Sequence, residues 1–373
     1  MKLLHTADLH LDTPFSLLDP EQSDRTLSQI RTTFSAMVQY VESQKVDLFF
    51  IAGDLFNNTF ASHETAAFLC REFASAPSCR FVIAPGNHDC YSEYSVYAKT
   101  EWPENVYIFK EPRLSCFTFD DLGVNVWGFA WDGPTFQKRI LEGFSLPGST
   151  GINLFCGHCE LTDRQSDNAP ISKEEIEASG FAYMALGHSH NSDGVKRIGS
   201  TCYGYAGVPV GRNYSETGSK GVLTAELENK SDGKDPISAI RRLRFSKHHF
   251  ENDTLDVTGA RDTAEVAARI RAHIEDRKYE KDTSLRLTLT GELSPEVLLS
   301  EEQLRGAADA VDTWECRIET RSRADGSALR RDPTIRGAYF DEFRSGAAGT
   351  DQHSPAVLAD ALRLGLHALD ASN

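Results

Sequence analysis

The chain has 373 residues, of which 40% are hydrophobic and 25% charged, and its formal net charge at pH 7 is −16. This length allows a sizeable core and more than one domain, and the composition is ordinary for a globular protein. The negative charge argues against a surface coated with non-specific nucleic-acid contacts, although a local basic patch is compatible with it.

No stretch approaches the roughly 18 consecutive apolar residues of a membrane span. The first residues, MKLLHTADLHLD, are too polar for a secretory signal, and the eight scattered cysteines suit a reducing compartment. We therefore expect a cytoplasmic protein that does not enter a membrane.

Five short apolar runs are the strongest secondary-structure signals, and they have the composition of strands that are buried on both faces. The runs are KLLHTA (2–7), VDLFFIAG (46–53), FVIAPG (81–86), INLFCG (152–157) and FAYMALG (181–187). Helical spacing over 24–44 and 62–75 separates the first three, as in β-α-β units. Short strands and turns follow over 106–130 and 195–250. The sequence predicts an α/β fold in which two β-sheets pack face to face as a sandwich, with helices outside.

The pattern changes near residue 250. Strand, helix, strand, helix and strand are expected in turn over 254–259, 264–277, 284–293, 300–311 and 313–322. A linker composition follows over 323–337, and then PAVLADALRLGLHAL (355–369) has the spacing of an amphipathic helix. We expect a main domain over 1–250, a small α+β domain over 251–322, and a linker with a C-terminal helix over 323–373. That helix has enough apolar surface to dock on its own core or on a partner protein.

Polar residues of the types that bind metals follow all five apolar runs. After four of the five runs, the first of these residues comes directly after a glycine. Strand ends of α/β folds are where sites are built, and glycine lets the chain turn sharply there. The candidate metal ligands are Asp8, His10, Asp54, Asn87, His158, His188 and His190. Any one of these histidines alone would more often be an ordinary hydrogen-bonded residue, but five successive strand ends are hard to attribute to chance.

This ligand chemistry indicates two divalent metals. Carboxylate, amide and imidazole groups suit Mn²⁺, Fe²⁺ or Zn²⁺ better than Ca²⁺ or Mg²⁺, whose sites favour oxygen. Seven ligands exceed what one catalytic metal with an open position takes, but they fit two metals if one carboxylate bridges them. Asp89, which follows Asn87 and His88, either supports its own turn, as we favour, or lies behind the metal ligands.

These motifs resemble those of the calcineurin-like metallophosphoesterases over about residues 1–200. The matching motifs are DLH (8–10), GD (53–54), GNHD (86–89), GH (157–158) and GHSH (187–190). The opening HTADLHLD and the form GDLF are similar to the SbcD-type DNA repair nucleases, particularly to their YhaO-like branch. By its position alone, the α+β domain is similar to the capping domain of that family.

The resemblance implies a role for each site residue. One metal would be held by Asp8, His10, Asp54 and His190, and the other by Asp54, Asn87, His158 and His188. The favoured metal at both positions is Mn²⁺, and Fe²⁺, Zn²⁺ or Mg²⁺ are the alternatives. A hydroxide between the metals would attack phosphorus, and His88, which is not a ligand, would assist the leaving oxygen.

Asn57 departs from the family pattern, because SbcD-type relatives usually carry His or Asp three residues after the bridging aspartate. An amide can form hydrogen bonds but carries no charge, so Asn57 would be a weaker orienting group at the catalytic centre. This replacement bears on the strength of exonuclease activity more than on the metal site itself.

Three functions are compatible with the sequence. The favoured one is a DNA exo/endonuclease in DNA repair, which acts on DNA with an SbcC-like ABC-type ATPase. The second is a phosphodiesterase or phosphatase that acts on small nucleotides or other small phosphoesters. The third, a structural metal site without catalysis, is least favoured, because a complete ligand set with His88 is more than such a site requires. The resemblance is also compatible with a homodimer.

One basic segment bears on the choice of substrate. The stretch 237–250 contains Arg241, Arg242, Arg244 and Lys247 and no acidic residue. These side chains either contact nucleic-acid phosphates or blunt an exposed strand edge, and the sequence favours neither interpretation.

Overall fold

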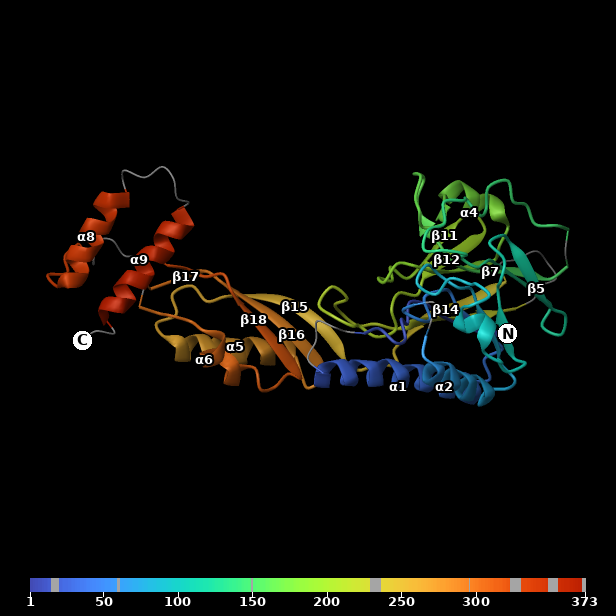
Figure 1. The fold of residues 1–373 in the computed structure, drawn as a ribbon, viewed down its shortest axis with the longest axis horizontal. Helices are drawn as coiled ribbons and strands as arrows, with labels where there is room; N and C mark the ends of the chain where they lie inside the picture. Colours follow the sequence, from blue (N-terminus) through green and yellow to red (C-terminus); the bar gives the residue numbers. More distant parts are fainter. Residues whose placement is uncertain are drawn as a thin grey trace. The chain divides into compact units, whose positions relative to one another are not determined.

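The structure is a computed structural model that describes residues 1–14, 20–58, 61–148, 150–228, 236–294, 296–322, 330–347 and 355–370. The chain divides into two compact units. Unit 1 comprises Met1–Arg212 and Gly218–Lys247, and unit 2 comprises Asn213–Thr217 and His248–Asn373. Unit 1 contains the strands that precede the candidate ligands (Figure 1).

The first sheet of unit 1 has six strands in the order β14-β13-β1-β2-β3-β4. They are β1 (Lys2–Thr6), β2 (Leu48–Ile51), β3 (Arg80–Ile83), β4 (Val106–Ile108), β13 (Val222–Leu227) and β14 (Ile237–Leu243). Strands β1 to β4 run parallel, whereas β13 pairs antiparallel with both β1 and β14. The parallel strands therefore bring their carboxyl ends to one edge of the sheet.

The second sheet also has six strands, in the order β11-β12-β10-β7-β6-β5. They are β5 (Ser115–Phe119), β6 (Val124–Gly128), β7 (Ile152–His158), β10 (Tyr183–Gly187), β11 (Val195–Ile198) and β12 (Thr201–Tyr205). The four inner strands are parallel, and the two edge strands pair antiparallel with their neighbours. The remaining elements of unit 1 are β8 (Glu160–Leu161), β9 (Pro170–Ile171), α1 (Pro20–Gln44), α2 (His63–Ala74), α3 (Val96–Lys99) and α4 (Lys173–Ser179).

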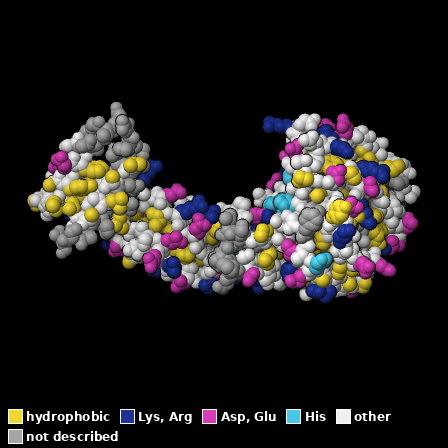
Figure 2. Space-filling model, viewed as in Figure 1, with side chains coloured by type: hydrophobic (Ala, Val, Ile, Leu, Met, Phe, Trp, Pro, Cys, Tyr) yellow, Lys and Arg dark blue, Asp and Glu magenta, His cyan; other side chains and the backbone are white. Residues whose placement is uncertain are grey.

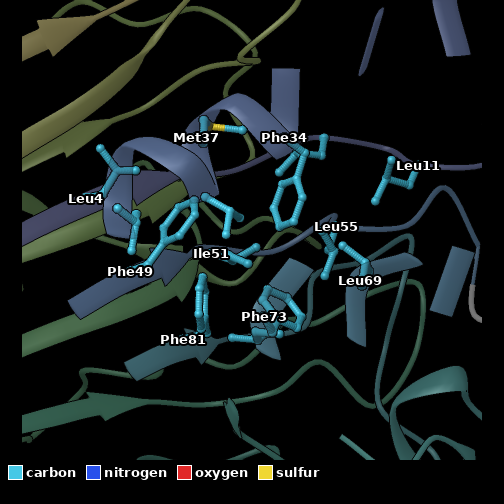
Figure 3. Close-up of a cluster of buried hydrophobic side chains, with 14 of the residues drawn as sticks. Leu4, Leu11, Phe34, Met37, Phe49, Ile51, Leu55, Leu69, Phe73 and Phe81 are labelled. Carbon is cyan, nitrogen blue, oxygen red and sulfur yellow. The ribbon is translucent and has the colours of Figure 1, made fainter. Parts of the chain in front are cut away.

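Alternate side chains of the strands bury two faces, as expected for a period of two residues. Phe50 of β2 and Leu154 of β7 belong to one buried cluster that both sheets share. On the other face of the first sheet, Phe81 packs against Phe73 of α2 with ring centroids 4.6 Å apart, and Phe34 of α1 lies beside Phe73 (Figure 3). The predicted α/β fold, with two packed sheets and helices outside, is confirmed.

Unit 2 is built on the three-stranded parallel sheet β15-β16-β18. Its elements are β15 (His249–Asp256), α5 (Thr263–Arg277), β16 (Thr283–Thr290), β17 (Glu292–Leu293), α6 (Glu301–Leu304), the 3₁₀ helix η1 (Arg305–Ala307), β18 (Thr313–Ile318), β19 (Arg321–Ser322), α8 (Ile335–Ala347) and α9 (Pro355–Asp370). The helix expected over 300–311 is much shorter, since α6 ends at Leu304 and only the 3₁₀ turn follows. The helix expected over 355–369 is present as α9, whereas α8 begins within the stretch that was expected to be a linker.

Helices α8 and α9 pack on each other through Phe340, Leu362 and Leu366. They also carry large apolar side chains on their surface, as the hydrophobic side chains over this pair show (Figure 2). Across the described residues, no helix combines the length and the apolar character that crossing a membrane requires.

Candidate metal centre

The candidate ligands lie at the carboxyl ends of β1, β2, β3, β7 and β10, where His158 is the last residue of β7 and the others lie on the loops that follow the strands. Two of these loops continue side by side beyond their strands, because the backbone N–H of Asp8 donates to the Gly53 carbonyl at 3.0 Å and that of His10 donates to the Asp54 carbonyl at 2.9 Å. In the other sheet, the N–H of Cys159 donates to the carbonyl of Gly187 at 3.3 Å. Backbone hydrogen bonds thus fix the loops in pairs.

Two glycines allow the loops to approach one another closely. Gly53 has a φ of +89°, which favours glycine. A Cβ atom added to Gly187 would lie 1.8 Å from the carbonyl oxygen of Ala52, so no other residue fits without moving the backbone. Since Ala52 follows β2 and Gly187 ends β10, this contact brings the ligand-bearing edges of the two sheets together.

Four candidate ligands have an unusual backbone conformation. Asp8, His10, Asp54 and His188 have positive φ values of 54°, 46°, 51° and 101°. They are half of the eight non-glycine residues with positive φ in the described part of the chain. Such conformations cost roughly 1–3 kcal/mol each and cluster at functional sites, where the surrounding structure enforces them.

Asp54 is central to the cluster. Its Oδ2 lies 3.6 Å from Nε2 of His10 and 3.4 Å from Nε2 of His158. On one side, Nε2 of His10 lies 3.3 Å from Nε2 of His190. On the other side, Nε2 of His158 lies 3.0 Å from Oδ1 of Asn87. The potential ligand atoms therefore form two groups that share Asp54.

The donor set fits two divalent cations. Asp8 and Asp54 are both buried, and Nδ1 of His10 is buried without a hydrogen-bond partner in the described residues. Burial, reinforced by the neighbouring Asp54 carboxylate, raises the pKa of Asp8 to about 6, and burial lowers the pKa of His10 to about 3. Burial acts to lower the pKa of His158, but Asp54 raises it to about 9. Cations would compensate the buried carboxylates and displace the proton of His158.

His188 and His88 lie beside the tightest part of the cluster. The ring of His188 contacts that of His158 edge to face at 5.2 Å, and its backbone N–H donates to Oδ1 of Asp8 at 3.2 Å. His88 is exposed, its backbone N–H donates to Oδ1 of Asp54 at 3.0 Å, and one of its ring nitrogens lies within 4.8 Å of ligand atoms of His10 and Asp54. Distance alone does not distinguish His88 from a ligand, so its role as a non-ligand stays a prediction.

Asn57 meets His88 through its backbone and not through its amide. Nδ1 of His88 lies 3.3 Å from the carbonyl oxygen of Asn57, and the N–H of Asn57 donates to the Leu11 carbonyl at 2.8 Å. Any residue at position 57 can supply this carbonyl. The identity of the side chain therefore matters less for orienting His88 than the sequence comparison with the family implies.

Asp89 connects two ligand loops. Its Oδ1 accepts the N–H of Gly86 at 2.7 Å and that of Asp54 at 3.2 Å, and its Oδ2 accepts the N–H of Leu55 at 2.7 Å and that of Phe56 at 3.1 Å. The bond to Gly86 supports its own turn, and the other three position the loop of Asp54. Both alternatives considered for Asp89 thus describe part of its environment.

The sequence interpretation missed two residues near the centre. Tyr97 is buried and donates its hydroxyl to Oδ2 of Asp89 at 2.6 Å. Arg212 is only 8% exposed and places Nη2 at 3.1 Å from Nδ1 of His190. One signal in the sequence was available for Arg212, which directly follows Gly211. Four of the five groups of candidate ligands also begin directly after a glycine. Nothing in the local sequence marks Tyr97.

The basic segment lies on an open sheet edge of unit 1. Strand β14 is the last strand of the first sheet, and Arg241, Arg242, Arg244 and Lys247 are all exposed. Within the described residues, no carboxylate lies within 4.0 Å of the guanidinium groups of the three arginines. Both interpretations of this segment stay open, since an edge strand can bind phosphate as well as resist unwanted pairing.

Comparison with known proteins agrees with this geometry. The chain is 25% identical over 374 residues to the metallophosphoesterase YhaO of Bacillus subtilis, covering 92% of this chain and 88% of the relative. It is 24% identical over 286 residues to the SbcD component of the SbcCD nuclease of Staphylococcus epidermidis, covering 68% and 74% of the two chains. It is 22% identical over 346 residues to the DNA double-strand break repair protein Mre11 of Methanopyrus kandleri, covering 87% and 71%.

The family model described as calcineurin-like phosphoesterase matches residues 1–192, which include every candidate metal ligand. The chain therefore belongs to the calcineurin-like phosphoesterase family.

Proposed function

We propose that this protein is a phosphodiesterase that uses two divalent metals, with Mn²⁺ as the favoured metal, and that its substrate is DNA. The observation that carries the proposal is the meeting of five strand-end loops around Asp54, with ligand atoms in two groups and an exposed His88 beside them. Membership of the calcineurin-like phosphoesterase family supports the general activity, a metal-dependent phosphoester hydrolase. Nuclease activity, exonuclease or endonuclease, is the finer proposal.

The residues of the chain would divide the work as follows. Asp8, His10 and His190 would hold one metal, Asn87, His158 and His188 the other, and Asp54 both. When bound, the metals supply Lewis-acid stabilisation of the phosphate and a nucleophilic water. Nδ1 of His88 donates to the carbonyl of Asn57, so Nε2 is the nitrogen that can donate a proton toward a leaving oxygen when the ring is in its doubly protonated imidazolium form. Histidine is the side chain best suited to exchange a proton near neutral pH.

The proposal of DNA as substrate rests on the relatives and on the charge distribution. Two of the relatives are named as a component of a nuclease and as a DNA double-strand break repair protein. Acidic and basic side chains are interspersed over the visible face of unit 1 (Figure 2), which favours a local contact with DNA through the exposed arginines of β14 over a general basic surface. Small phosphodiesters are the alternative substrates.

We further propose an ABC-type ATPase, similar to SbcC, as the partner, a cytoplasmic location and an assembly that is compatible with a homodimer. The domain division at 1–250, 251–322 and 323–373 is part of this proposal, with 251–322 as a capping domain. Segment 323–373 would dock the partner, and the support for this role is the exposure of Ile335 on α8 and of Val357 and Leu364 on α9.

A substrate panel with Mn²⁺ tests the proposal. It contains single-stranded and double-stranded DNA, RNA, cyclic nucleotides and bis-p-nitrophenyl phosphate. We expect hydrolysis of DNA and of bis-p-nitrophenyl phosphate, and loss of both after chelation of the metal. Activity confined to small diesters would reject the nuclease and leave the phosphodiesterase, whereas no activity on any diester would reject both.

A further inference from the structure

His5 is a buried histidine outside the set of candidate metal ligands. It lies on β1 between Leu3 and Ala7, and because side chains alternate along a strand, all three residues face the space between the two sheets. Leu3 and Ala7 belong to the apolar cluster that both sheets share, and His5 is only 1% exposed. A polar side chain in such a layer costs free energy unless its polar atoms are paired. The partners of His5 therefore indicate its role.

Both ring nitrogens of His5 form hydrogen bonds with the opposite sheet. Nε2 lies 3.2 Å from the carbonyl oxygen of Leu186, and Nδ1 lies 2.9 Å from the hydroxyl of Tyr183, both on β10. A carbonyl can only accept, so Nε2 donates to it, and Nδ1 accepts the hydroxyl of Tyr183. Burial lowers the pKa of His5 to about 3, against the opposing effect of the bond to Leu186, so the ring is neutral at cellular pH. One tautomer satisfies both nitrogens.

This bridge joins two strands that lead to candidate ligands of different sheets. Asp8 follows His5 by three residues along the chain, and His188 follows Leu186 by two. The same two chain segments meet again beyond the strands, where the backbone N–H of His188 donates to Oδ1 of Asp8 at 3.2 Å. The His5 bridge and this bond therefore hold the two segments together at two points.

Each of the two proposed metal positions takes ligands from both sheets. Asp8, His10, Asp54 and Asn87 follow strands of the first sheet, whereas His158, His188 and His190 lie at strand ends of the second. The separation of the sheets at this edge therefore decides whether both metals fit. A buried hydrogen bond defines that separation more narrowly than apolar contact does, because it weakens steeply when its distance or angle changes.

We propose that His5 is a positioning residue of the metal centre, which acts through its bond to the Leu186 carbonyl and is not itself a ligand. The inference rests on the dinuclear centre of the proposed function and adds the group that sets the spacing between the ligands of the two sheets. The bond to Leu186 carries this role, since it holds the backbone two residues before His188. The hydroxyl of Tyr183 keeps the ring in the tautomer that forms this bond.

Three substitutions of His5 separate its two hydrogen bonds. His5→Phe removes both, His5→Gln places an amide N–H near the position of Nε2, and His5→Asn places an amide oxygen near the position of Nδ1. We expect His5→Phe and His5→Asn to weaken manganese binding about tenfold and to lose the spectrum of exchange-coupled manganese ions, whereas His5→Gln should retain both. Calorimetric titration with Mn²⁺ and electron paramagnetic resonance measure these effects without a substrate.

Asn105→Ala is the control for a general loss of stability. The side-chain amide of Asn105 donates to the carbonyls of Phe73, Ala76 and Cys79 at 3.0, 3.0 and 3.2 Å. These bonds lie at the amino ends of β3 and β4, opposite to the ligand-bearing edge of the sheet. Urea unfolding of the metal-free protein should show a loss of stability in both Asn105→Ala and His5→Phe, but only His5→Phe should bind manganese more weakly.

Unchanged manganese binding in His5→Phe would overturn the proposal. An equal loss of binding in Asn105→Ala would overturn it too, as would binding in His5→Asn as tight as in His5→Gln. The outcome does not depend on the reaction: an unmodified protein that binds two exchange-coupled manganese ions but hydrolyses no diester would reject the proposed function and leave the role of His5 intact. Hydrolysis of bis-p-nitrophenyl phosphate together with unchanged manganese binding in His5→Phe would do the reverse.

Discussion

His88→Ala is expected to lower the turnover of bis-p-nitrophenyl phosphate by about 10²–10⁴-fold and to leave the affinity for Mn²⁺ unchanged. The reason is that His88 is exposed beside the cluster, with Nδ1 on the carbonyl of Asn57 and Nε2 able to donate a proton to the leaving oxygen. Steady-state kinetics and calorimetric titration with Mn²⁺ measure the two quantities on the same preparation.

Asn57→Ala is the matched control for this experiment. It keeps the backbone carbonyl that faces His88 and removes only the amide, so turnover should stay within about threefold of the unmodified protein. A fall in manganese affinity in His88→Ala as large as the fall in turnover would make His88 a ligand. A large loss of turnover in Asn57→Ala would mean that the amide acts directly at the site.

Asp89→Asn is expected to lower the free energy of unfolding by about 3–6 kcal/mol and to weaken manganese binding. Each carboxylate oxygen accepts two backbone N–H groups, and Oδ2 also accepts the hydroxyl of Tyr97. An amide can replace only one of these oxygens, and its NH₂ group would face buried donors, each of which costs about 1–3 kcal/mol when unpaired. Urea unfolding of the metal-free protein measures the first effect.

Tyr97→Phe serves as the graded comparison for Asp89, because it removes one of the five hydrogen bonds and retains the ring. Its unfolding free energy should fall by about 1 kcal/mol, with manganese binding nearly preserved. Equal stability of Asp89→Asn and the unmodified protein would show that the carboxylate is not what connects the loops of Gly86 and Asp54.

The fold was largely predictable because its signals are local. The strands that precede the ligands are short apolar runs, and each run ends in glycine or is followed directly by a polar residue, so these strands and the site residues could be predicted from the same pattern. Helix α8 was missed because Gly337 and the charged residues around it resemble a linker, and its buried Phe340 packs against Leu362 and Leu366 of α9, which lie more than 20 residues away in the sequence. The length of α6 was overestimated although Gly306, which lies in the 3₁₀ turn after the helix, disfavours a continuous helix.

The candidate ligands could be predicted because their side chains would bind the metals. The contacts that backbone groups make at the site could not be predicted. Residues such as Asp54 and His158 indicate metal binding by type and position. The contact of Asn57 with His88 uses a carbonyl that every residue possesses, so no substitution pattern reveals it. The bonds of Asp89 to residues 54–56 join segments more than 30 positions apart, and the approach of Arg212 to His190 requires the fold itself.

The most direct measurement of the central claim is anomalous diffraction from crystals grown with Mn²⁺, recorded at the manganese absorption edge. We expect two peaks per chain on either side of the Asp54 carboxylate, one beside Asp8, His10 and His190 and the other beside Asn87, His158 and His188. A single peak, or a peak whose nearest ligand is His88, would contradict a dinuclear centre with His88 as the proton donor.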